Sequence, residues 1–114
     1  MIELRLPLPP SSNRLWRVGR GRTYKSPEYQ EWLTTAGWIA RSQRPGKING
    51  AYALTVMASR PDRRRRDLDN FAFKAVSDLL VSLQIIADDS NCQELNAKWV
   101  SGGDGMTVHI EPIS

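Results

Sequence analysis

Four stretches of the chain alternate apolar and polar side chains, the pattern typical of strands with one buried face. They are residues 2–8, 51–60, 94–99 and 106–110. Because Pro7 cannot donate a backbone hydrogen bond, it marks the first strand as an edge strand or as its end. The glycine-rich run 101–105 lies between the last two stretches and predicts that they form a terminal hairpin.

Two further stretches carry apolar residues at steps of three and four, which predicts helices with one buried side. The first begins after Ser26, a cap residue followed by a first-turn proline, and ends at Pro45. The second spans about 70–86, and the segment before the first helix, up to Lys25, reads as a basic loop. The order is β-α-β-α-β-β, which predicts an α+β fold in which two helices pack on a small mixed sheet.

Length and composition narrow the class of protein. The chain has 114 residues, 40% of them hydrophobic, which predicts a single folded domain over residues 1–114. The lone cysteine, Cys92, excludes an internal disulfide, and the lone histidine, His109, excludes a site built from two histidines. No apolar run approaches the ~18 residues of a membrane span, and the N-terminus does not read as a signal peptide. We therefore expect a soluble cytoplasmic protein that binds neither a membrane nor a small-molecule cofactor.

Positive charge is concentrated in the first part of the chain. Residues 1–66 hold fourteen Lys and Arg against four acids, and residues 67–114 hold two against eight, so the net charges are +10 and −6. Arginine outnumbers lysine twelve to four, and its guanidinium binds phosphate oxygens in pairs. The split favours a phosphate-bearing partner over the alternative, a basic surface that only keeps the protein in solution.

The densest charge lies where the second strand meets the second helix. Four consecutive arginines, residues 63–66, repel one another and favour a negatively charged partner. Asp67 and Asp69 follow directly, and in extended backbone their carboxylates point to the same side. Such a pair is unfavourable without a cation between its members, and oxygen ligands suit Mg²⁺ or Mn²⁺. The alternative is that these aspartates cap the helix.

A second acidic pair, Asp88 and Asp89, lies between the second helix and the third strand. Acid pairs are frequent in loops, so this pair alone is a weak signal. If the third strand lies beside the second, however, Asp89 comes near Asp67 and Asp69. Carboxylates that share a metal ion beside basic residues are suited to phosphodiester hydrolysis.

Lys74 is a candidate for the same chemistry. On a helix that starts at Asp67, the positions of Asn70, Lys74 and Asp78 share one face. The ammonium group could there contact a phosphate, or it could form no more than an i,i+4 ion pair with Asp78. The sequence leaves both interpretations open.

Three segments carry a resemblance to a known family. They are residues 9–14 (PPSSNR), 19–24 (GRGRTY) and 61–70 (PDRRRRDLDN). They are similar to the opening, the basic loop and the central signature of the RusA-type Holliday junction resolvases, small dimeric endonucleases common in phages and prophages. The last of the three segments is highly specific.

The resemblance implies a magnesium-dependent, structure-selective endonuclease that resolves Holliday junctions by paired symmetric nicks in DNA recombination and repair. Manganese could replace magnesium, and the expected partners are branched DNA and a second copy of the chain. The resemblance places the metal-binding acids on Asp67, Asp69 and Asp89, and the catalytic lysine on Lys74. The residues expected to bind DNA are Arg14, Arg20, Arg22, Lys25, Arg63, Arg64, Arg65, Arg66 and Asn70.

One spacing departs from the family pattern. The family's lysine comes three residues after the asparagine, a position that Phe73 holds here, whereas Lys74 comes four residues after Asn70. A bulge or a tighter turn at the helix start would restore its direction; without one it points roughly 100° away. The shifted lysine leaves open a non-catalytic basic nucleic-acid-binding protein of the same fold. A second alternative is a basic scaffold or ribosome-associated protein that binds RNA by its shape.

The aromatic residues and the histidine are expected to be mainly structural. Trp32 and Trp99 fall on apolar faces and are predicted to lie in the core. Trp16 either stacks on nucleic acid or anchors the basic loop. Trp38 lies off the buried helix face, where it either joins a dimer interface or is partly buried. His109 is out of phase with the apolar residues of its strand and is predicted to face solvent.

Overall fold

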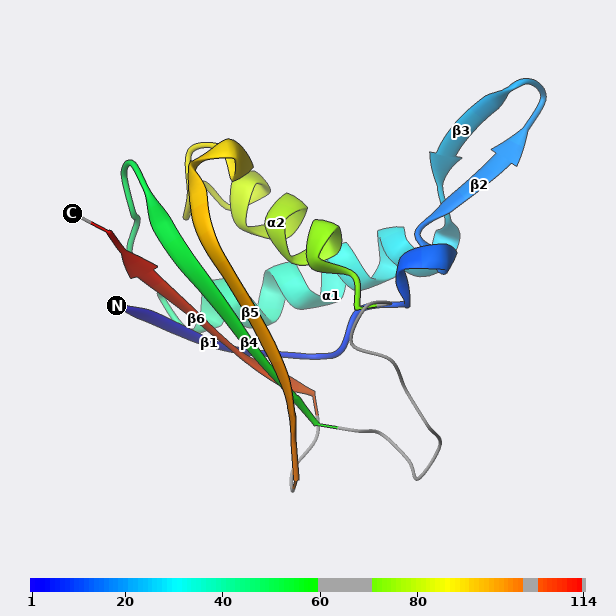
Figure 1. Cartoon of the computed structure of the whole chain (residues 1–114). Coiled ribbons are helices and arrows are strands. Elements are labelled where there is room, and N and C mark those ends of the chain that lie inside the picture. The colour runs from blue at the N-terminus through cyan, green and yellow to red at the C-terminus, as the bar shows by residue number, and fades with distance from the viewer. Residues whose placement is uncertain (60–70, 102–104, 114) are drawn as a thin grey trace.

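Four strands form the main sheet of the computed structural model, which describes residues 1–59, 71–101 and 105–113. The strands are β1 (Ile2–Leu6), β4 (Tyr52–Ser59), β5 (Cys92–Val100) and β6 (Met106–Pro112). Their order across the sheet is β1-β6-β4-β5 (Figure 1). β6 is antiparallel to β1 and β4, whereas β5 is parallel to β4. The sheet is therefore mixed, as predicted, and β1 lies at one edge of it.

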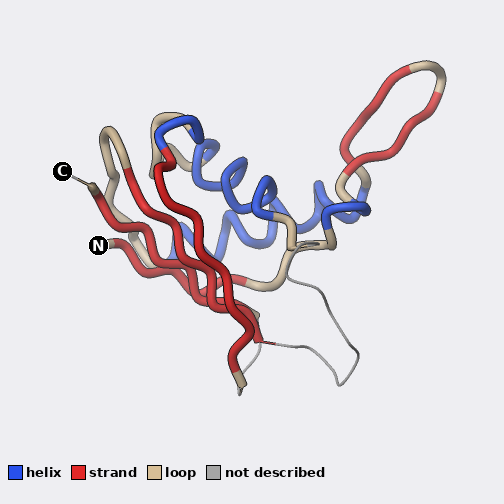
Figure 2. Tube along the Cα trace, viewed as in Figure 1, coloured by secondary structure: helices blue, strands red, loops and turns tan. Residues whose placement is uncertain are grey.

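Two α-helices within the described residues pack on one face of this sheet (Figure 2). The helical elements are η1 (Ser12–Arg14), α1 (Pro27–Ser42), α2 (Phe73–Ser82) and η3 (Asp89–Asn91), of which η1 and η3 are single 3₁₀ turns. The arrangement confirms the predicted α+β class. In the part of the chain that the structure describes, no helix is both long enough and apolar enough to cross a membrane.

The core lies between the sheet and the helices. Tyr52, Leu54 and Val56 alternate along β4 and are fully buried, and Val108 and Ile110 of β6 lie beside them. Burying a side chain of this size contributes roughly 1.5–3 kcal/mol to folding. This shared apolar layer fixes the helices against the sheet, and therefore fixes any residue that the helices carry.

Helix α1 begins where the sequence predicts. The buried hydroxyl of Ser26 accepts a hydrogen bond from the backbone N–H of Tyr29 at 3.1 Å, which caps the helix. The same hydroxyl donates to the carbonyl of Arg14 at 2.7 Å. Ser26 therefore joins the start of α1 to the segment that precedes the hairpin described below.

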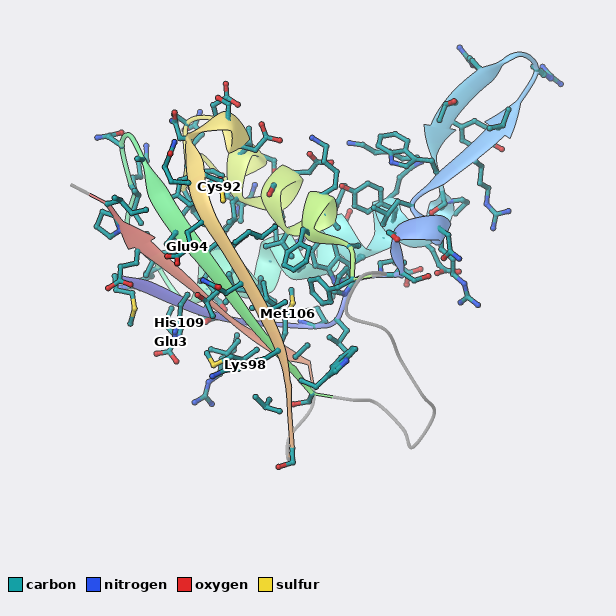
Figure 3. The ribbon with its side chains drawn as sticks, viewed as in Figure 1. Glu3, Cys92, Glu94, Lys98, Met106 and His109 are labelled. Atoms are coloured by element: carbon teal, nitrogen blue, oxygen red, sulfur yellow. The ribbon has the colours of Figure 1, made fainter. Side chains whose placement is uncertain are left out.

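The opposite face of the sheet is polar (Figure 3). Glu3, Lys98 and His109 project from three different strands on this side. His109 Nε2 lies 3.3 Å from Glu3 Oε1, so the histidine is on the polar face, as predicted. An antiparallel sheet commonly leaves one face to solvent in this way.

Three tryptophans can be compared with their predicted places. Trp32 is buried, and its indole N–H donates to the carbonyl of Pro7 at 3.0 Å, which confirms its place in the core. Trp99 is half-buried and packs against the core from its edge. Trp38 is 70% exposed, so its partial burial is not observed.

The predicted terminal hairpin is wrong. β5 and β6 are not neighbours; they lie on either side of β4, with β5 parallel and β6 antiparallel to it. The glycine-rich sequence after β5 would suit a tight turn to an antiparallel neighbour. β5 instead pairs in parallel with β4, and a parallel pair needs a long crossover, which α2 supplies. β5 is thereby an edge strand, and Leu95, an apolar residue of the alternating stretch 94–99, is 50% exposed.

The basic segment before α1 is also not the loop that was predicted. It forms a hairpin of β2 (Trp16–Gly19) and β3 (Arg22–Lys25) that projects from the body of the molecule (Figure 1). Arg20 and Gly21 make the turn with φ of 53° and 75°. Positive φ at both central residues is the requirement of a type I′ hairpin turn. None of the residues in either strand is buried, so the hairpin has no buried face whose period could reveal it in the sequence.

Candidate active site

Lys74 of α2 and Asp89 of η3 lie in contact. Lys74 is in the first turn of α2, and its Nζ donates to Asp89 Oδ2 at 3.2 Å. The same Nζ lies 3.2 Å from Asp78 Oδ1, one helical turn along α2. These contacts raise the pKa of Lys74, chiefly through the hydrogen bond to Asp89, so the ammonium is charged near neutral pH. The structure therefore brings together two of the four residues predicted for catalysis.

A tight turn at the start of α2 precedes this contact. Ala72 has φ −84° and ψ 72°, and the N–H of Phe73 donates to the carbonyl of Phe71 at 3.0 Å. Those values describe an inverse γ-turn. The N–H of Ala75 then donates to Ala72 at 3.1 Å, a 3₁₀-type bond. A tight turn therefore precedes Lys74, and the ammonium of Lys74 contacts Asp89.

The predicted helix boundaries are wrong at both ends. α2 spans Phe73–Ser82 rather than about 70–86, because the γ-turn delays its start and Gln84, with φ 60°, stops it. Of the predicted helical stripe, Asp67 and Asn70 lie outside the described residues, and α2 carries Lys74 and Asp78. The last step of the stripe, the i,i+4 pair of Lys74 and Asp78, is confirmed.

Several predicted site residues lie outside the described residues. They are Arg63, Arg64, Arg65, Arg66, Asp67, Asp69 and Asn70. Among residues 1–59, 71–101 and 105–113, no group of three or more His, Cys, Asp and Glu side chains could hold a metal ion. The predicted three-carboxylate site is thus represented by Asp89 alone in the described part of the chain.

Asp88 and Asp89 occupy different positions in the same short turn. The carboxylate of Asp88 accepts a hydrogen bond from the N–H of Ser90 at 3.1 Å and caps η3. This bond is the main reason that the pKa of Asp88 lies below its usual range. Because Asp88 is engaged with its own turn, Asp89 is the member of the pair that contacts α2.

Strand order places η3 at the start of β4 rather than at its end. Cys92, the first residue of β5, pairs with Tyr52, the first residue of the parallel strand β4. Ser59, at the other end of β4, is about 23 Å from Tyr52 at a rise near 3.3 Å per residue. The predicted neighbourhood of β4 and β5 is confirmed. Asp89 contacts Lys74 from the Cys92 end of β5.

The phenol of Tyr52 lies beneath this end of the site. Burial, followed by the nearby Cys92 thiol and the carboxylates of Asp89 and Asp88, raises the pKa of Tyr52 to about 12. All of these neighbours disfavour a phenolate. The hydroxyl of Tyr52 therefore remains protonated near the carboxylates of Asp88 and Asp89.

One contact in this region was not predicted from the sequence. Tyr29 of α1 donates a hydrogen bond from its hydroxyl to Asp78 Oδ2 at 2.6 Å. Burial and this carboxylate raise the pKa of Tyr29, so its hydroxyl stays a donor. The two residues are 49 positions apart, and an apolar helix face explained Tyr29 fully, so the sequence held no signal of their contact.

The hairpin is attached to α1 through the same tyrosine. The ring of Trp16 meets the Tyr29 ring edge-on, with centroids 6.0 Å apart. Lys25 Nζ lies 5.7 Å from the centre of the Tyr29 ring, within cation–π range. Trp16 is 43% exposed. The contact with Tyr29 supports the anchor interpretation of Trp16.

Exposed cations follow the hairpin outward from this anchor. Arg17, Arg20 and Arg22 have exposed side chains, and no described carboxylate lies within ion-pair distance of them. Arg14 is exposed at the end of η1, two residues before the first residue of β2. Arg17 was not among the residues predicted to bind DNA. Its place between Trp16 and the turn is the signal that could have included it.

Comparisons with known proteins bear on what this arrangement does. The family model described as Endodeoxyribonuclease RusA matches residues 7–111. The Crossover junction endodeoxyribonuclease RusA of Aquifex aeolicus (strain VF5) is 31% identical over 118 residues, which cover 98% of this chain and 92% of that protein. The protein of the same name from Escherichia coli (strain K12) is 38% identical over 92 residues, covering 77% of this chain and 73% of its own. A relative from Enterobacteria phage 82 has the same identity and coverage.

Proposed function

The chain belongs to the endodeoxyribonuclease RusA family, and from this premise we propose that it resolves Holliday junctions by paired symmetric nicks that require Mg²⁺. The chain is an endodeoxyribonuclease by its family. Its relatives are named for crossover junctions, which supports a four-way DNA junction as its substrate. The resemblance drawn from the three sequence segments is confirmed.

The contact between Lys74 and Asp89 carries the proposal. The shifted lysine was the feature of the sequence that favoured a non-catalytic protein. The structure supports the enzyme instead, because Lys74 Nζ lies 3.2 Å from the carboxylate of Asp89. An ammonium group beside a metal-binding carboxylate is well placed to stabilise the negative charge that builds on a phosphate during hydrolysis.

The metal site in this scheme consists of Asp67, Asp69 and Asp89. Asp89 fits a hard cation, since its carboxylate is 43% exposed and offers oxygen donors. In the sequence, Asp67 and Asp69 precede the first residue of α2 by six and four positions, and the first turn of α2 carries the lysine that contacts Asp89. A bound Mg²⁺ would polarise the phosphate and favour the ionised form of a water molecule; Mn²⁺ would serve in the same way.

DNA binding in this scheme begins at the hairpin. The exposed cations Arg14, Arg20, Arg22 and Lys25 suit the phosphate backbone, and we add Arg17 to them. The remaining residues proposed to bind DNA are Arg63, Arg64, Arg65, Arg66 and Asn70. Because contacts to phosphate are independent of sequence, they fit a protein that selects its substrate by shape.

The proposal includes a homodimer of single-domain chains acting in the cytoplasm, in DNA recombination and repair. A four-way junction needs two matched nicks, and two copies of one chain related by a two-fold axis supply two identical sites. No further cofactor or membrane takes part in the scheme.

A nicking assay on a synthetic four-way junction tests the proposed function. The wild type should produce symmetric nicks in Mg²⁺ and none in excess chelator. Asp69→Asn should lower the nicking rate by about 100-fold or more, since it removes one ligand charge from the metal site. Glu111→Gln, on an exposed position of β6, is the matched charge control and should nick at the wild-type rate.

Equal nicking by the wild type and Asp69→Asn would reject the metal assignment. A wild type that binds the junction but does not nick it in Mg²⁺ or Mn²⁺ would establish the non-catalytic alternative. Preference for duplex RNA over the junction in a competition gel would favour the RNA-binding scaffold.

A further inference from the structure

Asp78 lies between the candidate active site and the base of the hairpin, and the proposed function gives it no role. Its Oδ1 is 3.2 Å from Lys74 Nζ. Its Oδ2 accepts the hydrogen bond from Tyr29 at 2.6 Å. Both oxygens are thus engaged, one by α2 itself and the other by α1. With its side chain 25% exposed, this carboxylate is held in one orientation.

Lys74 needs an external constraint because of its chemistry. A lysine ammonium is a point charge on a stem of four flexible carbons, and the Lys74 side chain is 58% exposed. An exposed i,i+4 ion pair by itself orders such a side chain weakly. The short bond from the Tyr29 hydroxyl to an ionised carboxylate is of the stronger, charge-assisted kind. It fixes the direction from which Asp78 attracts Lys74.

The two carboxylates that hold Lys74 differ in what else they do. Asp89 belongs to the metal site of the proposed function, whereas Asp78 does not. The attraction of Asp78 for Lys74 is therefore independent of whatever Asp89 binds. Asp78 is the contact that keeps Lys74 in place when the carboxylate of Asp89 is otherwise engaged.

Tyr29 is itself rigidly placed. It lies in the first turn of α1, where its backbone N–H donates to Ser26, and its buried ring contacts Trp16 and Lys25 at the hairpin base. Because the hydroxyl stays protonated, it remains a hydrogen-bond donor throughout the neutral range. The position of Lys74 is thereby constrained by α1 as well as by its own helix, α2.

We propose that Tyr29 and Asp78 are positioning residues that hold the Lys74 ammonium in place for strand cleavage. The inference rests on the proposed function, which makes Lys74 a catalytic residue. In this scheme neither Tyr29 nor Asp78 contacts DNA or metal; both act through Lys74.

Single-turnover cleavage and junction binding, measured separately, test this role. Tyr29→Phe removes one hydroxyl and keeps the ring, and should lower the cleavage rate about 5- to 20-fold. Asp78→Asn should lower it about 10- to 100-fold, the scale expected when a reacting group is displaced by about 1 Å. The Kd for the junction should stay within about threefold in both variants. Glu31→Gln, exposed on α1, is the charge control and should match the wild type.

A double-mutant cycle separates positioning from a general loss of structure. In a Lys74→Gln background, Tyr29→Phe should have no further effect on the cleavage rate, because the group it orients is absent. Circular dichroism at the assay temperature should show all variants folded. Full additivity of the two substitutions would overturn the inference.

A second readout does not depend on activity. In NMR spectra of the metal-free protein, the two Hε protons of Lys74 should have distinct chemical shifts that merge in Tyr29→Phe and in Asp78→Asn. Unchanged Lys74 signals, or wild-type cleavage rates in both variants of an active enzyme, would overturn the inference. An inactive wild type would instead refute the proposed function, and the Lys74 signals alone would then show whether Tyr29 and Asp78 order this side chain.

Discussion

The hairpin and the site on α2 both present positive charge, but they hold it differently. Arg17, Arg20 and Arg22 project from the hairpin with no described carboxylate in ion-pair distance. Lys74 lies between Asp78 and Asp89, with both contacts at 3.2 Å. The hairpin carries exposed guanidinium groups without a described carboxylate partner, whereas the site on α2 holds a single ammonium group in place.

This difference corresponds to two physical tasks. Unpaired exposed cations attract phosphates at long range, and their effect weakens as salt rises. A cation held between carboxylates contributes less to attraction, because its field is partly cancelled, but it occupies a defined position. A reaction at one phosphate needs position more than attraction. Substitutions in the two regions should therefore separate binding from cleavage.

The largest effect is expected at Asp89. Asp89→Asn removes a proposed metal ligand and one of the two partners of Lys74, and should lower cleavage in Mg²⁺ by about 100- to 1,000-fold. Junction binding should be unchanged or tighter, since a negative charge is lost near DNA. Single-turnover nicking and gel-shift titration measure the two quantities. A parallel loss of binding would contradict the division of tasks.

The hairpin should show the opposite result. The double variant Arg17→Gln/Arg22→Gln should weaken junction binding by about 10-fold at moderate salt and reduce the salt slope by about two, one for each phosphate contact. Cleavage at saturating protein should stay near the wild-type rate. Arg41→Gln, in the last turn of α1, is the matched control. A changed rate at saturation would show that the hairpin also orients the reacting strand.

Gly105, directly before β6, and Gly21, in the hairpin turn, have nearly the same φ, so alanine substitutions there compare how well each place tolerates a side chain. Gly105 has φ 77°, and a Cβ there would lie 2.5 Å from the carbonyl oxygen of Leu6; Gly21, with φ 75°, has open space around it. Gly105→Ala should cost about 2–4 kcal/mol of unfolding free energy, from backbone strain plus the collision, and Gly21→Ala about 1 kcal/mol. Urea unfolding measures both. Equal losses of unfolding free energy would show that the chain directly before β6 accommodates a Cβ as easily as the hairpin turn does.

The smallest effect is expected from alkaline pH. Tyr52 has its pKa raised to about 12, so the folded state binds this proton more tightly than the unfolded chain does. Its contribution to stability is complete below pH 10 and is lost as pH rises from 10 to 12, by about 1 kcal/mol at pH 11. Tyr52→Phe should flatten the fall in urea stability across this window. An unchanged slope would show that the phenol does not ionise on unfolding.

Much of the fold follows from the sequence because periodicity reports burial. The alternation along β4 and the Ser26-Pro27 signal at α1 each reflect one local requirement, and both predictions are confirmed. Strand pairing is not local. The terminal-hairpin prediction took β5 and β6 as partners because they are consecutive, whereas β5 pairs with β4 through the α2 crossover.

The site was partly predictable because some residue types suggest their own chemistry. Lys74 and Asp89 could be chosen in this way, from charge and motif. The Tyr29–Asp78 contact could not, because each residue satisfies an ordinary helical pattern and only packing of α1 against α2 makes them neighbours. The strands of the hairpin were hidden by having no buried face.

The inverse γ-turn at Ala72 has a consequence for where α2 is allowed to begin. Ala72 has φ −84° and ψ 72°, outside the helical region, so a substitution that drew this residue into the helix would add a residue to the start of α2. The direction of the Lys74 side chain is set by its place in the first turn of that helix. The contact of its ammonium with Asp89 therefore depends on a backbone conformation two residues away.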